Sequence, residues 1–138
     1  MANRDIKPDN ILFATKAHGT NPAFEDRAQI ADFTTVIEIP NENYTVSDKA
    51  GTVAFMPPEC FNHTKYKPKP MDIWALGVSI YCCFFGKLPF VGDTENEMVE
   101  NIRNLEVKIP EECSDDLRQA LISLLTKDPE NRPSISEV

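Results

Sequence analysis

The chain has 138 residues, enough material for one domain, and its composition of 41% hydrophobic and 26% charged residues is that of a globular protein. Acidic residues outnumber basic residues by 22 to 14, which gives a formal charge of −8. This balance argues against a general binder of nucleic acid or anionic membranes, because such proteins need basic surface. We therefore expect neither nucleic acid nor a membrane among its partners.

The first half of the chain contains few long periodic segments. Short apolar runs at 11–13 and 28–31 predict two strands, separated by a polar stretch at 14–27. Residues 34–54 have no sustained period and carry many hydroxyl groups, which favours a long functional loop.

The second half predicts helices. Residues 71–85 are apolar nearly all round, as in a helix buried on every side. Thr94 begins a capping-box pattern, followed by an apolar face at 98, 99, 102 and 105. Ser114 is placed to cap a third helix with leucines at 117, 121, 124 and 125, and Ser134 to open a fourth.

Most of the negative charge lies between residues 91 and 116. A solvated helical face is the ordinary interpretation of such a stretch, and a docking surface for basic peptides is the alternative. Its nine acidic residues, against Arg103 and Lys108, are Asp93, Glu95, Glu97, Glu100, Glu106, Glu111, Glu112, Asp115 and Asp116.

The sequence gives no sign of secretion or membrane insertion. The first ten residues contain no apolar core, and the longest apolar run, 73–85, is shorter than the roughly 20 residues of a membrane span. No CxxC pair occurs among the cysteines, which we therefore predict to be reduced thiols in a cytoplasmic protein. They are Cys60, Cys82, Cys83 and Cys113.

Six short motifs then follow one another in a fixed order. The first, at 4–10, places a carboxylate (Asp5), an ammonium group (Lys7) and a carboxamide (Asn10) within six residues. After it come Ala-Asp-Phe at 31–33, Gly-Thr at 51–52, Pro-Pro-Glu at 57–59, Asp-Ile-Trp-Ala-Leu-Gly-Val at 72–78 and Asp-Pro-Glu-Asn-Arg-Pro at 128–133. Six motifs in this order and spacing make coincidence negligible.

On these motifs, all 138 residues resemble the C-terminal lobe of a eukaryotic protein kinase. The pattern Asp-x-Lys-Pro-x-Asn at 5–10 resembles the serine/threonine type. The run at 51–56 and Leu-Pro-Phe at 88–90 resemble the calcium/calmodulin-dependent kinase group and its upstream kinases.

The resemblance implies a mainly α fold, the large lobe of a kinase, with a short β-hairpin beside the catalytic loop and the N-terminal lobe absent. The implied segments are a catalytic loop at 3–10, an activation segment at 32–59 and a helical subdomain at 60–138. The implied cofactors are ATP and Mg²⁺. The implied partners are protein substrates and an upstream kinase or regulatory protein.

The resemblance also assigns roles in phosphoryl transfer, which depends on positioning and charge stabilisation. Asp5 orients the substrate hydroxyl and accepts its proton, and Lys7 neutralises charge on the transferred phosphate. Asn10 and Asp32 are oxygen ligands suited to magnesium. Leu12 lies beneath the adenine ring.

Four further residues match the family's structural set. Thr52 is expected to bond to the catalytic carboxylate and lysine. Glu59 and Arg132 match a buried salt bridge between the activation segment and the later helices. Asp72 is expected to hold the backbone of the catalytic loop.

The activation segment raises a question about phosphate. Arg4 matches an arginine that pairs with a phosphate on this segment in many kinases. Asp48 occupies the usual position of that phosphate. We hypothesise that Asp48 partly substitutes for it, with Ser47 as the neighbouring phosphorylation site; an exposed turn acid is the alternative.

The chain also departs from the family pattern. Asn3 replaces a histidine and can still donate a hydrogen bond, Thr34 replaces a glycine, and 14–27 is interpreted as an insertion. The glycine-rich loop, the ATP-positioning lysine and its partner glutamate belong to the N-terminal lobe and are missing. We therefore expect the isolated chain to be inactive. A pseudokinase-like interaction module, or an incomplete part of a longer gene, is the alternative.

Overall fold

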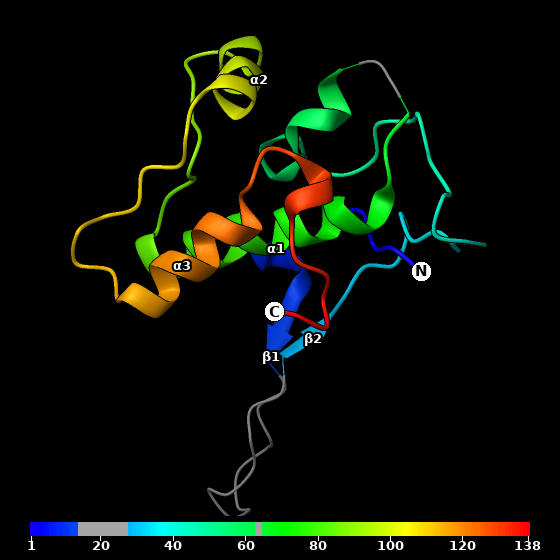
Figure 1. Ribbon diagram of the computed structural model, residues 1–138, viewed down its shortest axis with the longest axis horizontal. Helices are drawn as coiled ribbons and strands as arrows, with labels where there is room; N and C mark the ends of the chain where they lie inside the picture. Colours follow the sequence, from blue (N-terminus) through cyan, green and yellow to red (C-terminus); the bar gives the residue numbers. More distant parts are fainter. Residues whose placement is uncertain (14–27, 63–64) are drawn as a thin grey trace, which may run out of the picture.

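A computed structural model describes residues 1–13, 28–62 and 65–138, so the predicted insertion at 14–27 lies outside the described residues (Figure 1). The regular structure is mainly helical, with one small antiparallel sheet. The helices are α1 (Pro68–Phe85), α2 (Glu95–Asn104) and α3 (Asp115–Leu124), and the strands are β1 (Ile11–Phe13) and β2 (Ala28–Ile30). Short 3-10 turns lie at η1 (Pro8–Asn10), η2 (Val53–Phe55), η3 (Pro58–Phe61) and η4 (Pro129–Asn131).

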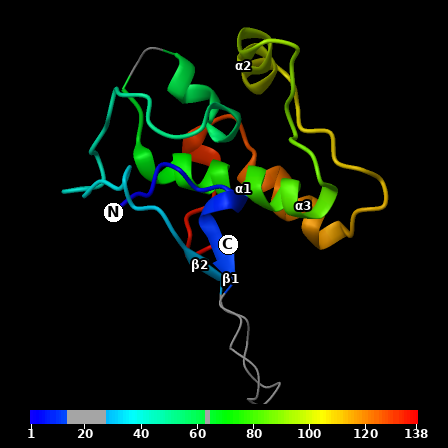
Figure 2. The same ribbon diagram turned by 180° about the vertical axis from the view of Figure 1, so that it is seen from behind.

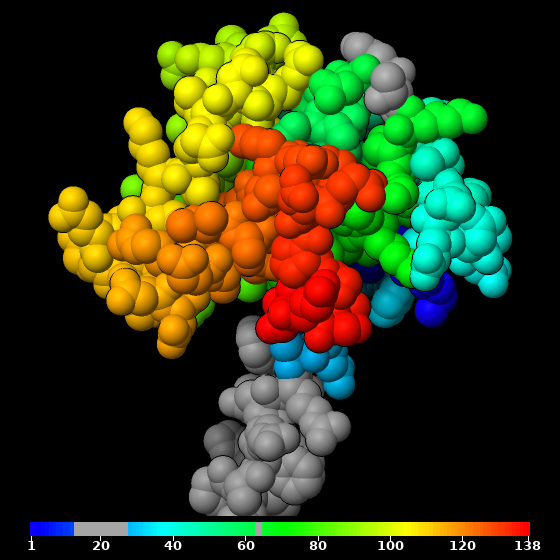
Figure 3. Space-filling model, viewed as in Figure 1, coloured from blue at the N-terminus to red at the C-terminus, as the bar shows by residue number. Residues whose placement is uncertain are grey.

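Helix α1 runs through the middle of the molecule (Figures 1 and 2). Trp74 on this helix is fully buried and stacks on Phe90, with ring centroids 5.7 Å apart. The prediction that this helix is buried on every side is wrong at its end, where Cys83 and Phe84 are exposed. Helix α3 and residues 126–138 cover one side of α1 (Figure 3), and at the end of α1 Phe84 lines a pocket together with the start of α3 and stays exposed. None of the helices in the described residues is long and apolar enough to cross a membrane.

The predicted caps of α2 and α3 are confirmed. The Thr94 hydroxyl accepts a bond of 3.2 Å from the Glu97 amide, and the Glu97 carboxylate accepts one of 2.8 Å from the Asp93 amide. The Ser114 hydroxyl accepts a bond of 3.4 Å from the amide of Leu117. These contacts satisfy amide groups that have no partner inside the helix.

The fourth helix predicted from Ser134 does not form. The Glu137 amide donates to the Ser134 carbonyl at 3.0 Å, which closes a single turn, and the Glu137 carboxylate accepts from the Ser134 amide and hydroxyl. One hydrogen-bonded turn does not repay the entropic cost of starting a helix. The prediction of a fourth helix is therefore wrong.

The two strands bring distant motifs together. Strands β1 and β2 pair antiparallel, with Ile11 opposite Ile30. Just beyond them the Ala31 amide donates to the Asn10 carbonyl at 2.8 Å. This bond holds the motif at 31–33 against the end of the motif at 4–10. In the predicted loop at 34–54, residues 34–52 contain no helix and only isolated bridges, as expected, but residues 53 and 54 lie in η2.

Candidate active site

Asp5 lies at the centre of a cluster of polar side chains. The Lys7 ammonium group is 2.9 Å from one Asp5 carboxylate oxygen, and the Thr52 hydroxyl donates to the other at 2.8 Å. The same hydroxyl accepts a bond of 2.8 Å from Lys7. The Asn10 amide nitrogen donates to the Asp5 carboxylate at 3.2 Å and to its backbone carbonyl at 2.9 Å. The predicted contacts of Thr52 are therefore present.

These contacts keep Asp5 ionised. Burial alone raises the pKa of the Asp5 carboxyl group, but the bonds from Lys7, Thr52 and Asn10 and the charge of Lys7 outweigh burial, and the net pKa is lowered. A carboxylate that is charged at neutral pH can accept a proton from a hydroxyl group.

A glycine allows Thr52 to reach Asp5. Gly51 has a φ angle of 103°, which residues with a side chain rarely adopt. A Cβ atom at this position would lie 2.2 Å from the Arg4 carbonyl oxygen. The two backbone segments therefore approach closely only because residue 51 has no side chain.

Asp72, near the start of α1, holds the backbone of the candidate catalytic loop as predicted. Its carboxylate accepts bonds of 2.6 Å from the Asn3 amide and 2.7 Å from the Arg4 amide. Burial raises the pKa of Asp72, although these two amides act against the increase. The bonds fix residues 3 and 4 from the side of the central helix.

Asn3 does not make the hydrogen bond expected of it. Its side-chain oxygen accepts from the Asp5 amide at 3.0 Å, but its buried amide nitrogen has no partner among the described residues. The reason is orientation: the side chain turns its oxygen toward the loop. Asn3 therefore acts as an acceptor, and its capacity to donate is not used within the described residues.

Asp32 lies beyond the end of β2, is exposed, and has a φ angle of 59°. Thr34 donates to one oxygen of its carboxylate from the hydroxyl group at 2.6 Å and from the backbone amide at 3.1 Å. The Thr34 hydroxyl bond is the main reason that the pKa of Asp32 is lowered. Sequence analysis did not predict this contact, which depends on Thr34 having a hydroxyl group.

Arg4 and Asp48 form an ion pair of 2.7 Å. The Arg4 side chain is buried, and its Nε also donates to the Thr35 carbonyl at 2.9 Å. The Tyr66 hydroxyl donates to the Asp48 carbonyl at 2.5 Å. The sequence therefore identified the pair itself but missed Tyr66 and Thr35, which orient its two members.

The amino-acid sequence of the chain is similar to those of known proteins. Residues 1–138 match the protein kinase domain family. The chain belongs to this family. It is 38% identical over 140 residues to serine/threonine-protein kinase ppk34 of Schizosaccharomyces pombe, covering all of this chain and 37% of that protein. It is 33% identical over 134 residues to serine/threonine-protein kinase GRIK1 of Arabidopsis thaliana, covering 97% of this chain and 32% of that protein.

A third relative is calcium/calmodulin-dependent protein kinase kinase cmkC of Emericella nidulans. It is 32% identical over 141 residues, covering all of this chain and 26% of that protein. The chain thus spans between 26% and 37% of the length of these three relatives. All three relatives are named as protein kinases.

The predicted salt bridge of the kinase domain is present and buried. The Arg132 guanidinium group donates to both carboxylate oxygens of Glu59, at 2.6 and 2.7 Å, and its side chain is completely buried. It also donates to the carbonyls of Thr126, Lys127 and Pro70 at 2.7, 3.0 and 3.0 Å. This contact joins η3 to the segment after α3.

Lys127, which no sequence motif includes, packs over two aromatic rings and joins α2 to the segment after α3. Its ammonium group lies 4.1 Å from the ring centre of Phe90 and 5.1 Å from that of Trp74, and it donates to the carbonyl of Ile102 in α2. Burial lowers the pKa of Lys127 to about 8. Only the Asp-Pro motif beside it drew attention to this part of the sequence.

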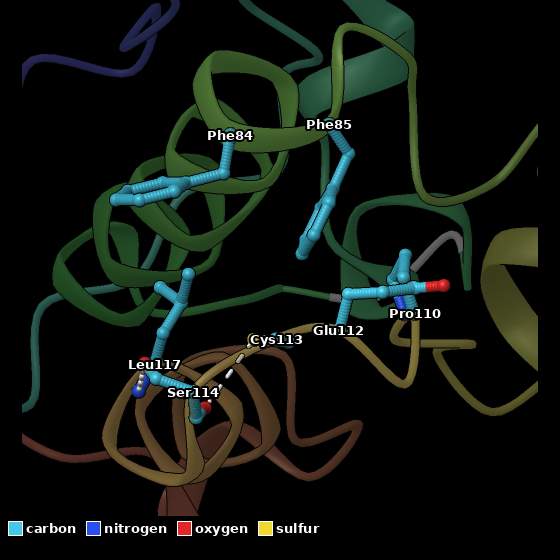
Figure 4. Close-up of a pocket in the computed structure, with 7 residues that line it drawn as sticks. All are labelled: Phe84, Phe85, Pro110, Glu112, Cys113, Ser114 and Leu117. Atoms are coloured by element: carbon cyan, nitrogen blue, oxygen red, sulfur yellow. Dashed lines mark hydrogen bonds between the residues drawn. The ribbon is translucent and has the colours of Figure 1, made fainter.

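The surface of the described residues has two pockets, and only one of them reaches a residue that contacts Asp5. One, of about 410 Å³, lies between Phe84 and Phe85 at the end of α1 and residues 110–117, and contains none of the predicted site residues (Figure 4). The other, of about 470 Å³, is a groove between residues 52–54 and residues 92–98. It begins at Thr52, which contacts Asp5 directly.

Proposed function

We propose that this chain is the C-terminal lobe of a serine/threonine protein kinase, which transfers phosphate from ATP to serine or threonine side chains of proteins. The main support is the contact of Asp5 with Lys7, Thr52 and Asn10. In this proposal residues 3–10 are the catalytic loop, 32–59 the activation segment and 60–138 the helical subdomain.

The proposed reaction depends on positioning. The Asp5 carboxylate would accept a hydrogen bond from the substrate hydroxyl and take its proton as the hydroxyl oxygen bonds to the γ-phosphorus of ATP and the bond from that phosphorus to the ADP oxygen breaks. Lys7 is 2.9 Å from Asp5, so its positive charge would offset negative charge on a phosphate brought to Asp5. Thr52 holds both side chains at 2.8 Å and fixes their separation.

The residues present fit a magnesium ion and a nucleotide. Asn10 uses its amide nitrogen for Asp5, which leaves its amide oxygen as a ligand, and the exposed Asp32 carboxylate supplies a second hard oxygen donor. When bound, Mg²⁺ supplies positive charge that offsets the charge of the phosphates. Leu12 is 54% exposed on β1 and offers apolar surface for the adenine ring of ATP.

We propose that Asp48 partly replaces a phosphate on the activation segment. The support is its ion pair with the buried Arg4 side chain. In the complete gene product, Asp48→Ala removes this pair and is expected to lower kinase activity, with Ser47→Ala as the control for a neighbouring phosphorylation site. Unchanged activity in Asp48→Ala would contradict the proposal.

The relative named as a calcium/calmodulin-dependent protein kinase kinase supports placing this chain near that group. The motifs at 51–56 and 88–90 point the same way. We extend the proposal to a cytoplasmic enzyme that acts on protein substrates and is controlled by an upstream kinase or regulatory partner.

A second candidate is a catalytically inactive, pseudokinase-like interaction module. The observations that favour it are the Asn3 amide nitrogen, which has no partner among the residues that the structure describes, and the Thr34 hydroxyl bound to Asp32. In this case the chain keeps its fold and its helical surface but transfers no phosphate.

The experiment that tests the proposed function is transfer of labelled phosphate from ATP to a serine/threonine peptide library. The complete gene product is compared with its Asp5→Asn variant, which removes the proton acceptor and leaves a side chain of the same shape. We expect transfer that is lost in Asp5→Asn. Absence of transfer by both proteins, with intact folding by circular dichroism, would favour the interaction module.

A further inference from the structure

Thr34 stands where the family pattern has a glycine, and its side chain contacts the proposed metal ligand Asp32. The Thr34 hydroxyl group donates to the Asp32 Oδ1 atom at 2.6 Å, and the Thr34 backbone amide donates to the same atom at 3.1 Å. A glycine at this position has an amide but no hydroxyl group. Thr34 therefore adds a bond to Asp32 that a glycine cannot make.

The backbone on either side of Asp32 is anchored by contacts with the candidate catalytic loop. The Ala31 amide donates to the Asn10 carbonyl at 2.8 Å, and the Thr35 hydroxyl donates to a backbone carbonyl of that loop at 2.7 Å. Asp32 has a φ angle of 59°, which is uncommon for a residue other than glycine. Its side chain is exposed, and among the described residues only Thr34 donates hydrogen bonds to its carboxylate. The orientation of this carboxylate therefore depends on Thr34.

The two proposed metal ligands are held in the same way. The Asn10 side chain uses its amide nitrogen to bond to the Asp5 carboxylate at 3.2 Å, and its amide oxygen accepts no bond from the described residues. The Asp32 side chain uses Oδ1 for Thr34, and its Oδ2 atom accepts no bond within the described ranges. Each side chain is thus oriented through one polar atom and keeps one oxygen for a cation. Oxygen is the ligand type that Mg²⁺ prefers.

We propose that Thr34 is a positioning residue of the metal site, whose hydroxyl group orients the Asp32 carboxylate so that Oδ2 is the oxygen that binds Mg²⁺. The proposal rests on the proposed kinase function, in which Asp32 and Asn10 are the metal ligands. The opposite interpretation is that the hydroxyl bond occupies the carboxylate and prevents metal binding, as in the interaction module. The two interpretations predict opposite effects when the hydroxyl group is removed.

The test is the affinity for Mn²⁺, a paramagnetic ion that also binds oxygen ligands, measured by electron paramagnetic resonance. Free Mn²⁺ is quantified while the metal is titrated into the complete gene product with a non-hydrolysable ATP analogue. Thr34→Val removes the hydroxyl group and keeps the backbone amide and the branched shape, and Thr34→Ser keeps the hydroxyl group. Thr45→Val is the matched control, because Thr45 lies in the same loop and its hydroxyl group forms no hydrogen bond with the described residues.

We expect Thr34→Val to weaken Mn²⁺ binding by about three- to tenfold, as for the loss of one hydrogen bond to an exposed carboxylate. Thr34→Ser and Thr45→Val should bind Mn²⁺ as the wild type does. In a protein that also carries Asp32→Ala, Thr34→Val should have no further effect, because the hydroxyl group acts through that carboxylate.

Four results would overturn the proposal. The first is unchanged or tighter Mn²⁺ binding in Thr34→Val, and the second is a loss in Thr34→Ser as large as that in Thr34→Val. The third is an equal effect of Thr34→Val with and without Asp32→Ala. The fourth is absence of Mn²⁺ binding by the wild type.

This readout is separate from the proposed kinase function, since metal binding requires no phosphate transfer. Transfer of labelled phosphate is measured in parallel as a function of Mg²⁺ concentration, and Thr34→Val should raise the Mg²⁺ concentration at half-maximal rate more than it lowers the rate at saturating Mg²⁺. Transfer with unchanged Mn²⁺ binding in Thr34→Val contradicts the positioning role but retains the kinase. Mn²⁺ binding that depends on Thr34 and Asp32, without any transfer, contradicts the kinase but retains the positioning role.

Discussion

Replacing Glu59 by glutamine would leave the Arg132 guanidinium group buried without a carboxylate partner. In the wild type, this group is completely buried and donates to both oxygens of Glu59 at 2.6 and 2.7 Å. Three backbone carbonyls, of Thr126, Lys127 and Pro70, accept its remaining bonds. Glutamine keeps one acceptor oxygen and the shape of the side chain but removes the negative charge.

Breaking a buried ion pair from one side costs about 3–5 kcal/mol, because the remaining charge is desolvated and uncompensated. The three carbonyl acceptors remain in place, and the amide oxygen of the new glutamine can still accept one bond from the guanidinium group. We therefore expect the free energy of unfolding to fall by about 3 kcal/mol, at the lower end of that range. A domain of ordinary stability has only about 5–15 kcal/mol in total, so this loss is large.

The assay is urea unfolding, followed by circular dichroism and by the fluorescence of Trp74, the single tryptophan of the chain. Trp74 lies beneath the guanidinium group, with the Arg132 Cζ 5.0 Å from its ring centre. Glu130→Gln is the matched control, since it removes an exposed ion pair with Lys67 and is expected to cost less than about 1 kcal/mol. If Glu59→Gln costs no more than this control, the reasoning is refuted.

Three further outcomes are expected. Burial lowers the pKa of Lys127 from 10.5 to about 8, so between these pH values the unfolded chain binds more protons than the folded chain. The free energy of unfolding of the wild type, measured relative to Lys127→Met, should therefore rise with pH across this window, and a difference that falls or stays flat would contradict the assignment. Thr52→Val removes the bond to Asp5 and should slow phosphate transfer about tenfold to hundredfold, while Thr52→Ser should keep most of the rate in the same kinetic assay. Gly77→Ala places a Cβ atom 2.8 Å from that of Leu124, so thermal unfolding should show a loss of about 1–3 kcal/mol, and an unchanged melting temperature would contradict the close packing of α1 and α3.

The elements predicted best are those with local signals. The capping contacts at Thr94 and Ser114 formed as expected, because each joins residues three positions apart. The predicted start of the central helix at 71 was three residues late, since α1 begins at Pro68. Proline is compatible with the first turn of a helix, where its missing amide has no intrahelical partner to lose.

The candidate site was predictable where the motifs carry it. The contacts of Asp5 with Thr52 and of Arg132 with Glu59 join residues 47 and 73 positions apart, and no local pattern indicates such pairs. They followed from the family resemblance. The bond from Thr34 to Asp32 and the position of Lys127 over two aromatic rings did not, because the family pattern says nothing of either.

Asn3 departs from the family pattern in its side chain, and its backbone anchors the candidate catalytic loop. Within the described parts of the chain the Asn3 amide nitrogen has no partner, but the Asn3 backbone is held from two sides. Its amide donates to Asp72 at 2.6 Å, and its carbonyl accepts from the Thr35 hydroxyl at 2.7 Å. The Thr35 carbonyl in turn accepts a hydrogen bond of 2.9 Å from the Arg4 Nε. Because these anchors act on backbone atoms, they connect the loop that carries Asp5 to the central helix and to residues 32–35, and the Asn3 side-chain oxygen adds one bond of 3.0 Å from the Asp5 amide.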